Sequence, residues 1–195
     1  MFESNAGRAR IKARDDAREI LKYATETRKF EIERFWQRSL FFWGFIASAF
    51  VAYAAVINKD LDDDTALLIS CFGLVCSVAW TLQNRGGKYW QEAWEQKVAA
   101  IEVKALGISL YNSEEPVFGE DFWGASRYSV SRLTIALSDF TVVVWIVLGV
   151  KAFPWACGGP GVNPSPYILG TFTVVYVGCL FVGGHSSSKS WRLQS

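Results

Sequence analysis

The chain alternates between long apolar runs and strongly charged stretches. Four runs are almost entirely apolar, and they cover residues 40–57, 66–82, 133–150 and 167–184. Together they contain one charged residue, Asp139. A helix that crosses the hydrocarbon core of a bilayer needs about 20 mostly apolar residues. The pattern therefore predicts an all-α, polytopic integral membrane protein with four transmembrane helices. Such a protein is embedded in a lipid bilayer, which is thus one of its expected partners.

The composition supports this prediction and narrows the alternatives. The 195 residues are 51% hydrophobic, and the net charge is +1. A soluble domain intersperses its charges along amphipathic elements, whereas here the charges are confined to the stretches between the runs. Four buried core helices would also need more amphipathic chain around them than the sequence offers. The near-neutral balance gives no reason to expect a nucleic-acid partner.

The basic residues are distributed unequally between the two sides that four spans define. Residues 1–39, 83–132 and 185–195 hold 18 of the 20 Lys and Arg residues, and the connections 58–65 and 151–166 hold one each. Since Lys and Arg accumulate on the cytoplasmic side, we expect both termini in the cytoplasm. The predicted segments are a cytoplasmic N-terminal helix (1–39), a transmembrane hairpin (40–82), a cytoplasmic amphipathic helix and loop (83–132), a second hairpin (133–184) and a cytoplasmic tail (185–195).

The longest predicted cytoplasmic connection contains an amphipathic helix. After a flexible break at Gly86-Gly87, a stripe at helical spacing includes Trp90, Trp94 and Ile101, and it continues through Val98, Ala105 and Ile108. The stripe must be buried in the membrane interface, in the cytoplasmic layer of the same chain or against another subunit. We expect Trp90, Trp94 and Ile101 to form the cytoplasmic packing or subunit contact. An acidic loop is expected over residues 112–125.

Small residues recur at four-residue spacing within two of the spans. Gly44, Ser48 and Ala52 lie on one face of the first span, and Gly73 and Ser77 lie on one face of the second. Small residues on a shared face let helices approach closely in lipid. We expect these residues to mediate span packing, within one chain or between chains.

Asp139 is the one candidate for polar chemistry inside a span. A carboxylate there costs about 3 kcal/mol unless it is paired or hydrated, and it commonly marks a polar pathway. Two interpretations are open. In the first, Asp139 lies near the cytoplasmic end of the span, where it caps the helix through Ser138-Asp139 or pairs with Arg132 or Arg85. In the second, it lines the inner end of a pore in a symmetric oligomer, where a ring of carboxylates favours cations.

Motifs of known enzymes are absent from the sequence. It contains no CxxC, no HExxH, no Ser-His-Asp candidate set and no Gly-rich phosphate loop. We therefore expect no enzymatic activity, no catalytic residue, no metal site and no cofactor.

Three stretches resemble the RipA family of small bacterial membrane proteins. They are KFEIERFWQRSLFFWGFIASAFVAY (29–53), NRGGKYWQEAWEQKVAAIE (84–102) and RYSVSRLTIALSDFTVVVW (127–145), of which the WQEAWE segment is the most specific. The resemblance covers about residues 28–184. It implies an octameric membrane protein, hence a homo-octamer in the bacterial inner membrane, and it carries no catalytic residues with it.

These observations lead to one expected function and two alternatives. The expectation is a non-enzymatic homo-octameric membrane protein that forms a pore or channel-like ring. The first alternative is a membrane-anchored scaffold whose cytoplasmic layer recruits a protein partner. The second, a membrane-embedded enzyme, would need polar residues clustered at one depth, whereas the spans offer only scattered Ser and Thr.

Overall fold

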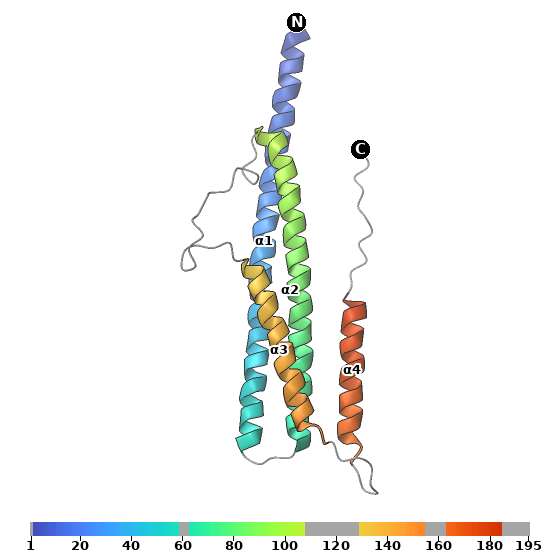
Figure 1. Cartoon of the computed structure of the whole chain (residues 1–195). Coiled ribbons are helices and arrows are strands. Elements are labelled where there is room, and N and C mark those ends of the chain that lie inside the picture. The colour runs from blue at the N-terminus through green and yellow to red at the C-terminus, as the bar shows by residue number, and fades with distance from the viewer. Residues whose placement is uncertain (1, 59–62, 108–128, 155–162, 185–195) are drawn as a thin grey trace, which may run out of the picture. The chain divides into compact units, whose positions relative to one another are not determined.

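The computed structural model is made of four α-helices in the residues that it describes, 2–58, 63–107, 129–154 and 163–184. The helices are α1 (Phe2–Asn58), α2 (Asp63–Leu106), α3 (Val130–Ala152) and α4 (Ser165–Gly183) (Figure 1). All four are long and apolar enough to cross a membrane. The predicted all-α fold of a polytopic membrane protein with four spanning helices is confirmed.

The chain divides into two compact units, and α1 and α2 contribute to both. The charged unit comprises residues 1–38 and 85–132, and the apolar unit comprises residues 39–84 and 133–195. The loop expected over 112–125 and the tail over 185–195 lie outside the described residues.

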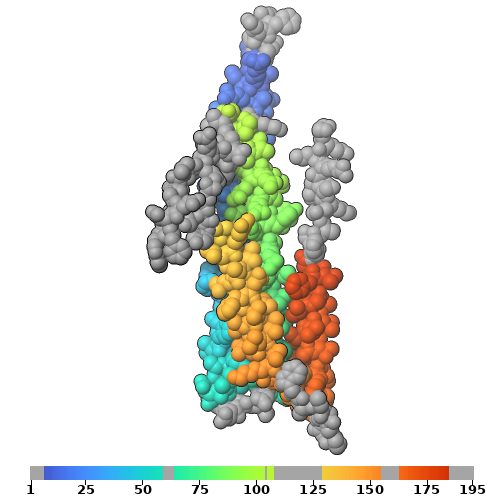
Figure 2. Space-filling view, in the orientation of Figure 1, coloured from blue at the N-terminus to red at the C-terminus, as the bar shows by residue number. Residues whose placement is uncertain are grey.

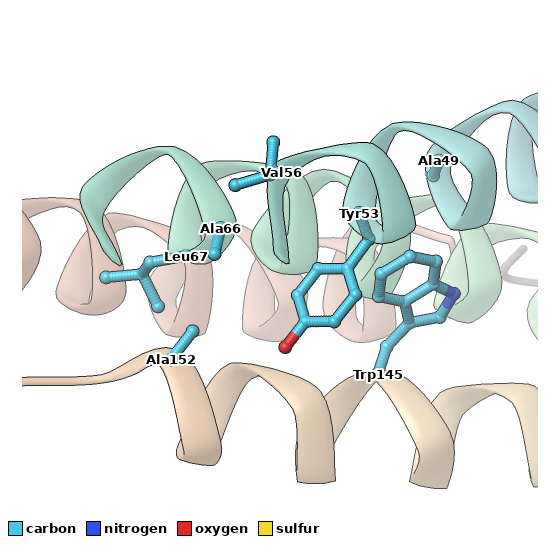
Figure 3. Close-up of a cluster of buried hydrophobic side chains, with 7 residues drawn as sticks. All are labelled: Ala49, Tyr53, Val56, Ala66, Leu67, Trp145 and Ala152. Atoms are coloured by element: carbon cyan, nitrogen blue, oxygen red, sulfur yellow. The ribbon is translucent and has the colours of Figure 1, made fainter. Parts of the chain in front are cut away.

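The core of the apolar unit surrounds the indole of Trp145. This α3 side chain is fully buried, stacks on Phe50 with 4.4 Å between ring centroids, and meets Tyr53 edge-on at 6.1 Å. Gly73 of α2 lies directly against the indole, where any larger residue would collide with it. Figure 3 shows Trp145 beside residues of α1 and α2, and the drawn cluster comprises Ala49, Tyr53, Val56, Ala66, Leu67, Trp145 and Ala152. Aromatic rings packed at these distances contribute about 0.5–1.5 kcal/mol per pair beyond the area that they bury.

The charged unit shows that the predicted break at Gly86-Gly87 is wrong. Both glycines lie inside the uninterrupted helix α2, which continues to Leu106. A glycine costs a helix only about 1 kcal/mol relative to alanine, so packing can retain the helical conformation. At Gly87 the packing is evident, because the ring of buried Phe35 from α1 occupies the space that a Cβ would need. Gly87 therefore provides close helix contact and not flexibility.

Candidate functional site

Buried hydroxyl and amide side chains line the facing surfaces of α2 and α3 in the apolar unit. Thr134, Ser138 and Thr141 of α3 recur at 4-3 spacing and continue to Trp145, so they share one face of the helix. In α2 the matching face carries further buried polar residues. We call the following set the polar seam: Ser77, Thr81 and Asn84 of α2, Thr134, Ser138 and Thr141 of α3, and Ser39 of α1.

The register between α2 and α3 follows from two close approaches. Gly73 meets Trp145, and a Cβ built on Gly149 would lie 3.7 Å from the Cβ of Ser70. In this antiparallel pair, each step forward along α2 is matched by a step backward along α3. Extending the register places Ser77 of α2 at the level of Thr141 of α3. It also places Asn84, the last seam residue of α2, near the level of Thr134, the first seam residue of α3.

Part of the hydrogen-bonding capacity of the seam is used within helices or between them. The hydroxyls of Ser138 and Thr141 donate to backbone carbonyls of their own helix at 2.8 Å. Ser39 of α1 donates to Oδ1 of Asn84 at 3.4 Å, which joins α1 to α2. These bonds connect the seam to the backbone and to a third helix.

Three further polar atoms of the seam are buried without a hydrogen-bond partner among the described residues. The atoms concerned are Ser77 Oγ, Thr81 Oγ1 and Asn84 Nδ2. Ser77 and Asn84 have no exposed surface. A polar group buried without a hydrogen bond costs about 1–3 kcal/mol in mutational series, so these atoms would gain from a small polar molecule such as water. Chemically, the seam can hold the three helices in a fixed rotation and can bind such a molecule.

Asp139 follows the fully buried Ser138 in α3. The helix begins at Val130, and the hydroxyl of Ser129 accepts a bond from the backbone N–H of Arg132 at 3.4 Å. The interpretation of Asp139 as a helix cap is therefore wrong, because Asp139 lies more than two turns inside the helix. A rotation of about 100° per residue turns Asp139 away from the interior face that Ser138 occupies, and its side chain is half-buried.

The two predicted sets of small residues have different surroundings. Gly73 and Ser77 face the interior of the apolar unit. Gly44 and Ser48 of α1 are exposed, and a Cβ on Gly44 would meet nothing within 4 Å. Ala52 is half-buried. The small residues of α1 therefore form an exposed surface, and no other described part of the chain packs closely on it at Gly44.

The predicted aromatic stripe of α2 is divided between interior and surface. Val98 and Ala105 are buried inside the charged unit, whereas Trp90 remains 49% exposed. Trp94 and Ile101 are half-buried. The helix thus buries Val98 and Ala105 and leaves the indole of Trp90 half exposed.

Two neighbouring aromatic contacts complete this surface. Trp90 packs edge-on against Tyr89 at 5.7 Å, and the Lys97 ammonium lies 4.5 Å from the centre of the Trp94 ring. Cation–π contacts at exposed sites contribute about 0.5–1 kcal/mol. We call Tyr89, Trp90 and Trp94 the aromatic patch of the charged unit.

Ionic contacts hold the charged unit together. Arg28 of α1 pairs with Glu95 of α2 at 2.9 Å, and Gln91 donates to the same carboxylate at 3.3 Å. Lys88 bonds Glu92 at 2.6 Å, and this hydrogen bond and charge lower the pKa of the Glu92 carboxyl below its ordinary value. Among the described residues, no group of three His, Cys, Asp or Glu side chains is placed to hold a metal ion.

The comparisons with known proteins agree with this membrane architecture. The model of the octameric membrane protein family matches residues 18–154, more than two thirds of the chain. The chain belongs to the octameric membrane protein family. Neither a curated protein nor a solved structure matches it.

Membership in the octameric membrane protein family confirms the expected family, while the RipA designation remains a resemblance. The match begins inside α1 and ends just after α3, so it includes the aromatic patch and all three helical segments of the polar seam. The chain is a homo-oligomeric, multi-pass membrane protein, and the family supports the predicted homo-octamer.

The polar seam is the feature that sequence analysis missed. The Ser and Thr residues were treated as scattered, because hydropathy averages over all faces of a helix. The available signal was the 4-3-4 spacing of Thr134, Ser138, Thr141 and Trp145. This spacing places the three hydroxyls on the same face of the helix as the indole.

Proposed function

We propose that eight copies of this chain form a ring in the bacterial inner membrane that conducts cations, with both termini in the cytoplasm. The orientation is supported by the excess of Lys and Arg in the charged stretches. The ring is supported by membership in the octameric membrane protein family. The ring has no enzymatic role in this proposal, in keeping with the absence of catalytic motifs.

The position of Asp139 is the observation that carries the conducting role. Asp139 is the single charged residue in the third apolar run, and it is neither a helix cap nor part of the interior face of α3. Ionisable residues inside spans commonly mark ion pathways. In an eightfold ring, one such carboxylate per subunit would form an acidic ring near the cytoplasmic end of the pathway, which selects for cations.

The open surfaces supply candidate subunit contacts. Gly44, Ser48 and Ala52 offer α1 a small-residue face for close approach to a neighbouring helix. The aromatic patch offers the charged unit large rings at an exposed position, and aromatic residues are enriched at interfaces between proteins. Trp90, Trp94 and Ile101 thus remain our predicted oligomer contact.

The experiment is single-channel recording of purified protein in a planar bilayer. We expect step currents with cation selectivity, and we expect Asp139→Asn to shift the reversal potential toward zero in a salt gradient. Asp15→Asn is the matched control, because it removes the same charge from an exposed site in the charged unit. Silence of the wild-type protein at all tested voltages, or equal effects of the two variants, would contradict the proposal.

A scaffold that recruits a soluble cytoplasmic protein is the second candidate. The exposed pair Tyr89 and Trp90 favours it, since such a surface can bind a partner protein as well as another subunit. An intact, electrically silent octamer that loses a co-purifying protein upon Trp90→Ala would support the scaffold.

A further inference from the structure

An apolar groove lies between α2, α3 and α4 within the apolar unit. Its volume is about 720 Å³. We call it the α4 groove, and its walls include Leu74 from α2, Ile146 and Val150 from α3, and Val174 and Val177 from α4. Figure 2 shows α4 (red) standing beside α3 (orange). The groove explains why α4 buries few of its residues, which are Pro166 and Thr173.

Two hydroxyl groups in the walls are already hydrogen-bonded within their own helices. Ser70 donates to the carbonyl of Ala66 at 2.8 Å, and Thr173 donates to that of Leu169 at 2.9 Å. Each hydroxyl is thus satisfied within its own helix. An occupant of the α4 groove therefore needs apolar surface and no hydrogen bond to Ser70 or Thr173. One further wall residue, Trp145, has an indole Nε1 that is buried without a hydrogen-bond partner among the described residues.

The length of the groove matches one leaflet of a bilayer. Along α4 its walls extend from Tyr167 to Val177, which corresponds to roughly 15 Å at about 1.5 Å per residue. This is half of the hydrocarbon core, which is about 30 Å thick. A lipid acyl chain spans this distance when it reaches from its headgroup to the bilayer centre.

A helix of a second subunit is the other occupant that these apolar walls could accept. The experiment below distinguishes such a helix from a hydrocarbon chain.

Aromatic residues mark the end of the groove at which a lipid would enter. Phe153, just after α3, meets Tyr167 in the first turn of α4 edge-on at 5.3 Å, and the Tyr167 hydroxyl donates to the carbonyl of Pro154 at 3.3 Å. Both residues line the groove at the end where α3 stops and α4 begins. Tyrosine concentrates at membrane–water interfaces because its ring is apolar and its hydroxyl is polar.

We propose that the α4 groove binds one acyl chain of a phospholipid from the leaflet next to the connection between α3 and α4. Each subunit then carries one such lipid, which fills the space between α4 and the other helices. This proposal depends on the membrane-spanning fold and not on ion conduction. A silent octamer would leave it intact.

Photo-crosslinking of the octamer in phosphatidylglycerol vesicles tests the proposal. The probe is phosphatidylglycerol with a diazirine at the middle of an acyl chain, and labelled peptides are identified by mass spectrometry. We expect labels on the walls of the groove in α2 and α3. Gly149→Leu, which places a side chain in the groove, should lower this labelling at least about tenfold.

Two further variants keep the result interpretable. Gly178→Leu is the matched control, because it adds the same side chain to α4 at a position with nothing within 4 Å, and it should leave the labelling unchanged. Val150→Trp fills the groove from a residue that is 51% exposed, so it should fold and also lose the label if Gly149→Leu is unstable.

Two results would overturn the proposal. One is wall labelling that is unchanged in the correctly assembled Gly149→Leu and Val150→Trp octamers. The other is a covalent dimer formed by a benzophenone attached to Cys71 in a chain whose other cysteines are alanine, since Cys71 lines the groove and the dimer would identify a second subunit as its occupant.

Discussion

The adjacent glycines of α2 provide a sharp test of the packing in the charged unit. Gly86 and Gly87 belong to the same helix, yet their surroundings differ. A Cβ added to Gly86 meets nothing within 4 Å, whereas a Cβ added to Gly87 would lie 2.6 Å from Cδ2 of Phe35. Phe35 is buried, so its ring cannot simply turn into solvent. The same substitution at neighbouring positions should therefore have opposite effects.

The magnitudes follow from two opposing contributions. Alanine stabilises a helix by about 0.8–1 kcal/mol relative to glycine, and this gain is available at both positions. Overpacking a buried site costs about 1–3 kcal/mol, and this cost applies only at Gly87. We expect Gly86→Ala to stabilise α2 by about 1 kcal/mol and Gly87→Ala to destabilise it by about 1 kcal/mol, a separation of about 2 kcal/mol.

Hydrogen–deuterium exchange of the octamer in detergent measures this separation locally. A difference of about 2 kcal/mol corresponds to roughly a thirtyfold difference in the opening constant of α2 peptides after residue 85. Phe35→Leu should partly restore protection in the Gly87→Ala protein, because it removes the colliding ring edge. If both alanine variants change exchange with the same sign and size, Phe35 does not pack on Gly87 and the close helix contact is refuted.

Three further predictions concern other parts of the molecule. Gly73→Ala should lower resistance to SDS unfolding by about 1–3 kcal/mol because the new methyl group collides with the Trp145 indole, and Trp145→Phe should relieve part of that loss. Trp94→Ala should weaken the oligomer in mild detergent, and an unchanged native mass would exclude Trp94 from the contact. Lys88→Gln should raise the pKa of Glu92 toward its ordinary value in an NMR titration, because it removes the hydrogen bond and the charge that lower this pKa. Any stability that the pair contributes is present above the ordinary pKa and is lost as the pH falls through the lowered pKa. An unshifted carboxyl resonance would show that Lys88 does not act on Glu92.

The membrane architecture could be predicted from sequence because bilayer thickness imposes it directly. Each apolar run had to be helical, since a span in lipid must satisfy its backbone hydrogen bonds internally. The four runs accordingly lie in the four observed helices. Length and polarity were sufficient for this conclusion, and no knowledge of side-chain contacts was needed.

Interior packing was harder to predict because it depends on which face of each helix meets a neighbour. Trp90 belongs to a regular apolar stripe, but the buried part of that stripe is at Val98 and Ala105. The Gly86-Gly87 break was expected from local propensity, whereas Phe35 packs on Gly87 from a distant part of the sequence. The contact of Phe35 with Gly87 joins α1 to α2, and periodicity within one helix carries no information about it.

Packing of the polar seam also constrains where Asp139 can act. Ser138 and Trp145 are fully buried two turns apart on α3, so the rotation of this helix about its axis is fixed by two independent points. Turning Asp139 into the interior would bring Ser138 and Trp145 out of it, with loss of the Phe50 stack and the close approach of Gly73. Asp139 therefore stays off the interior face of α3 and remains half-buried beside it. A change in conductance upon Asp139→Asn is therefore read together with the native mass of the variant octamer, which shows whether the subunit still folds and assembles.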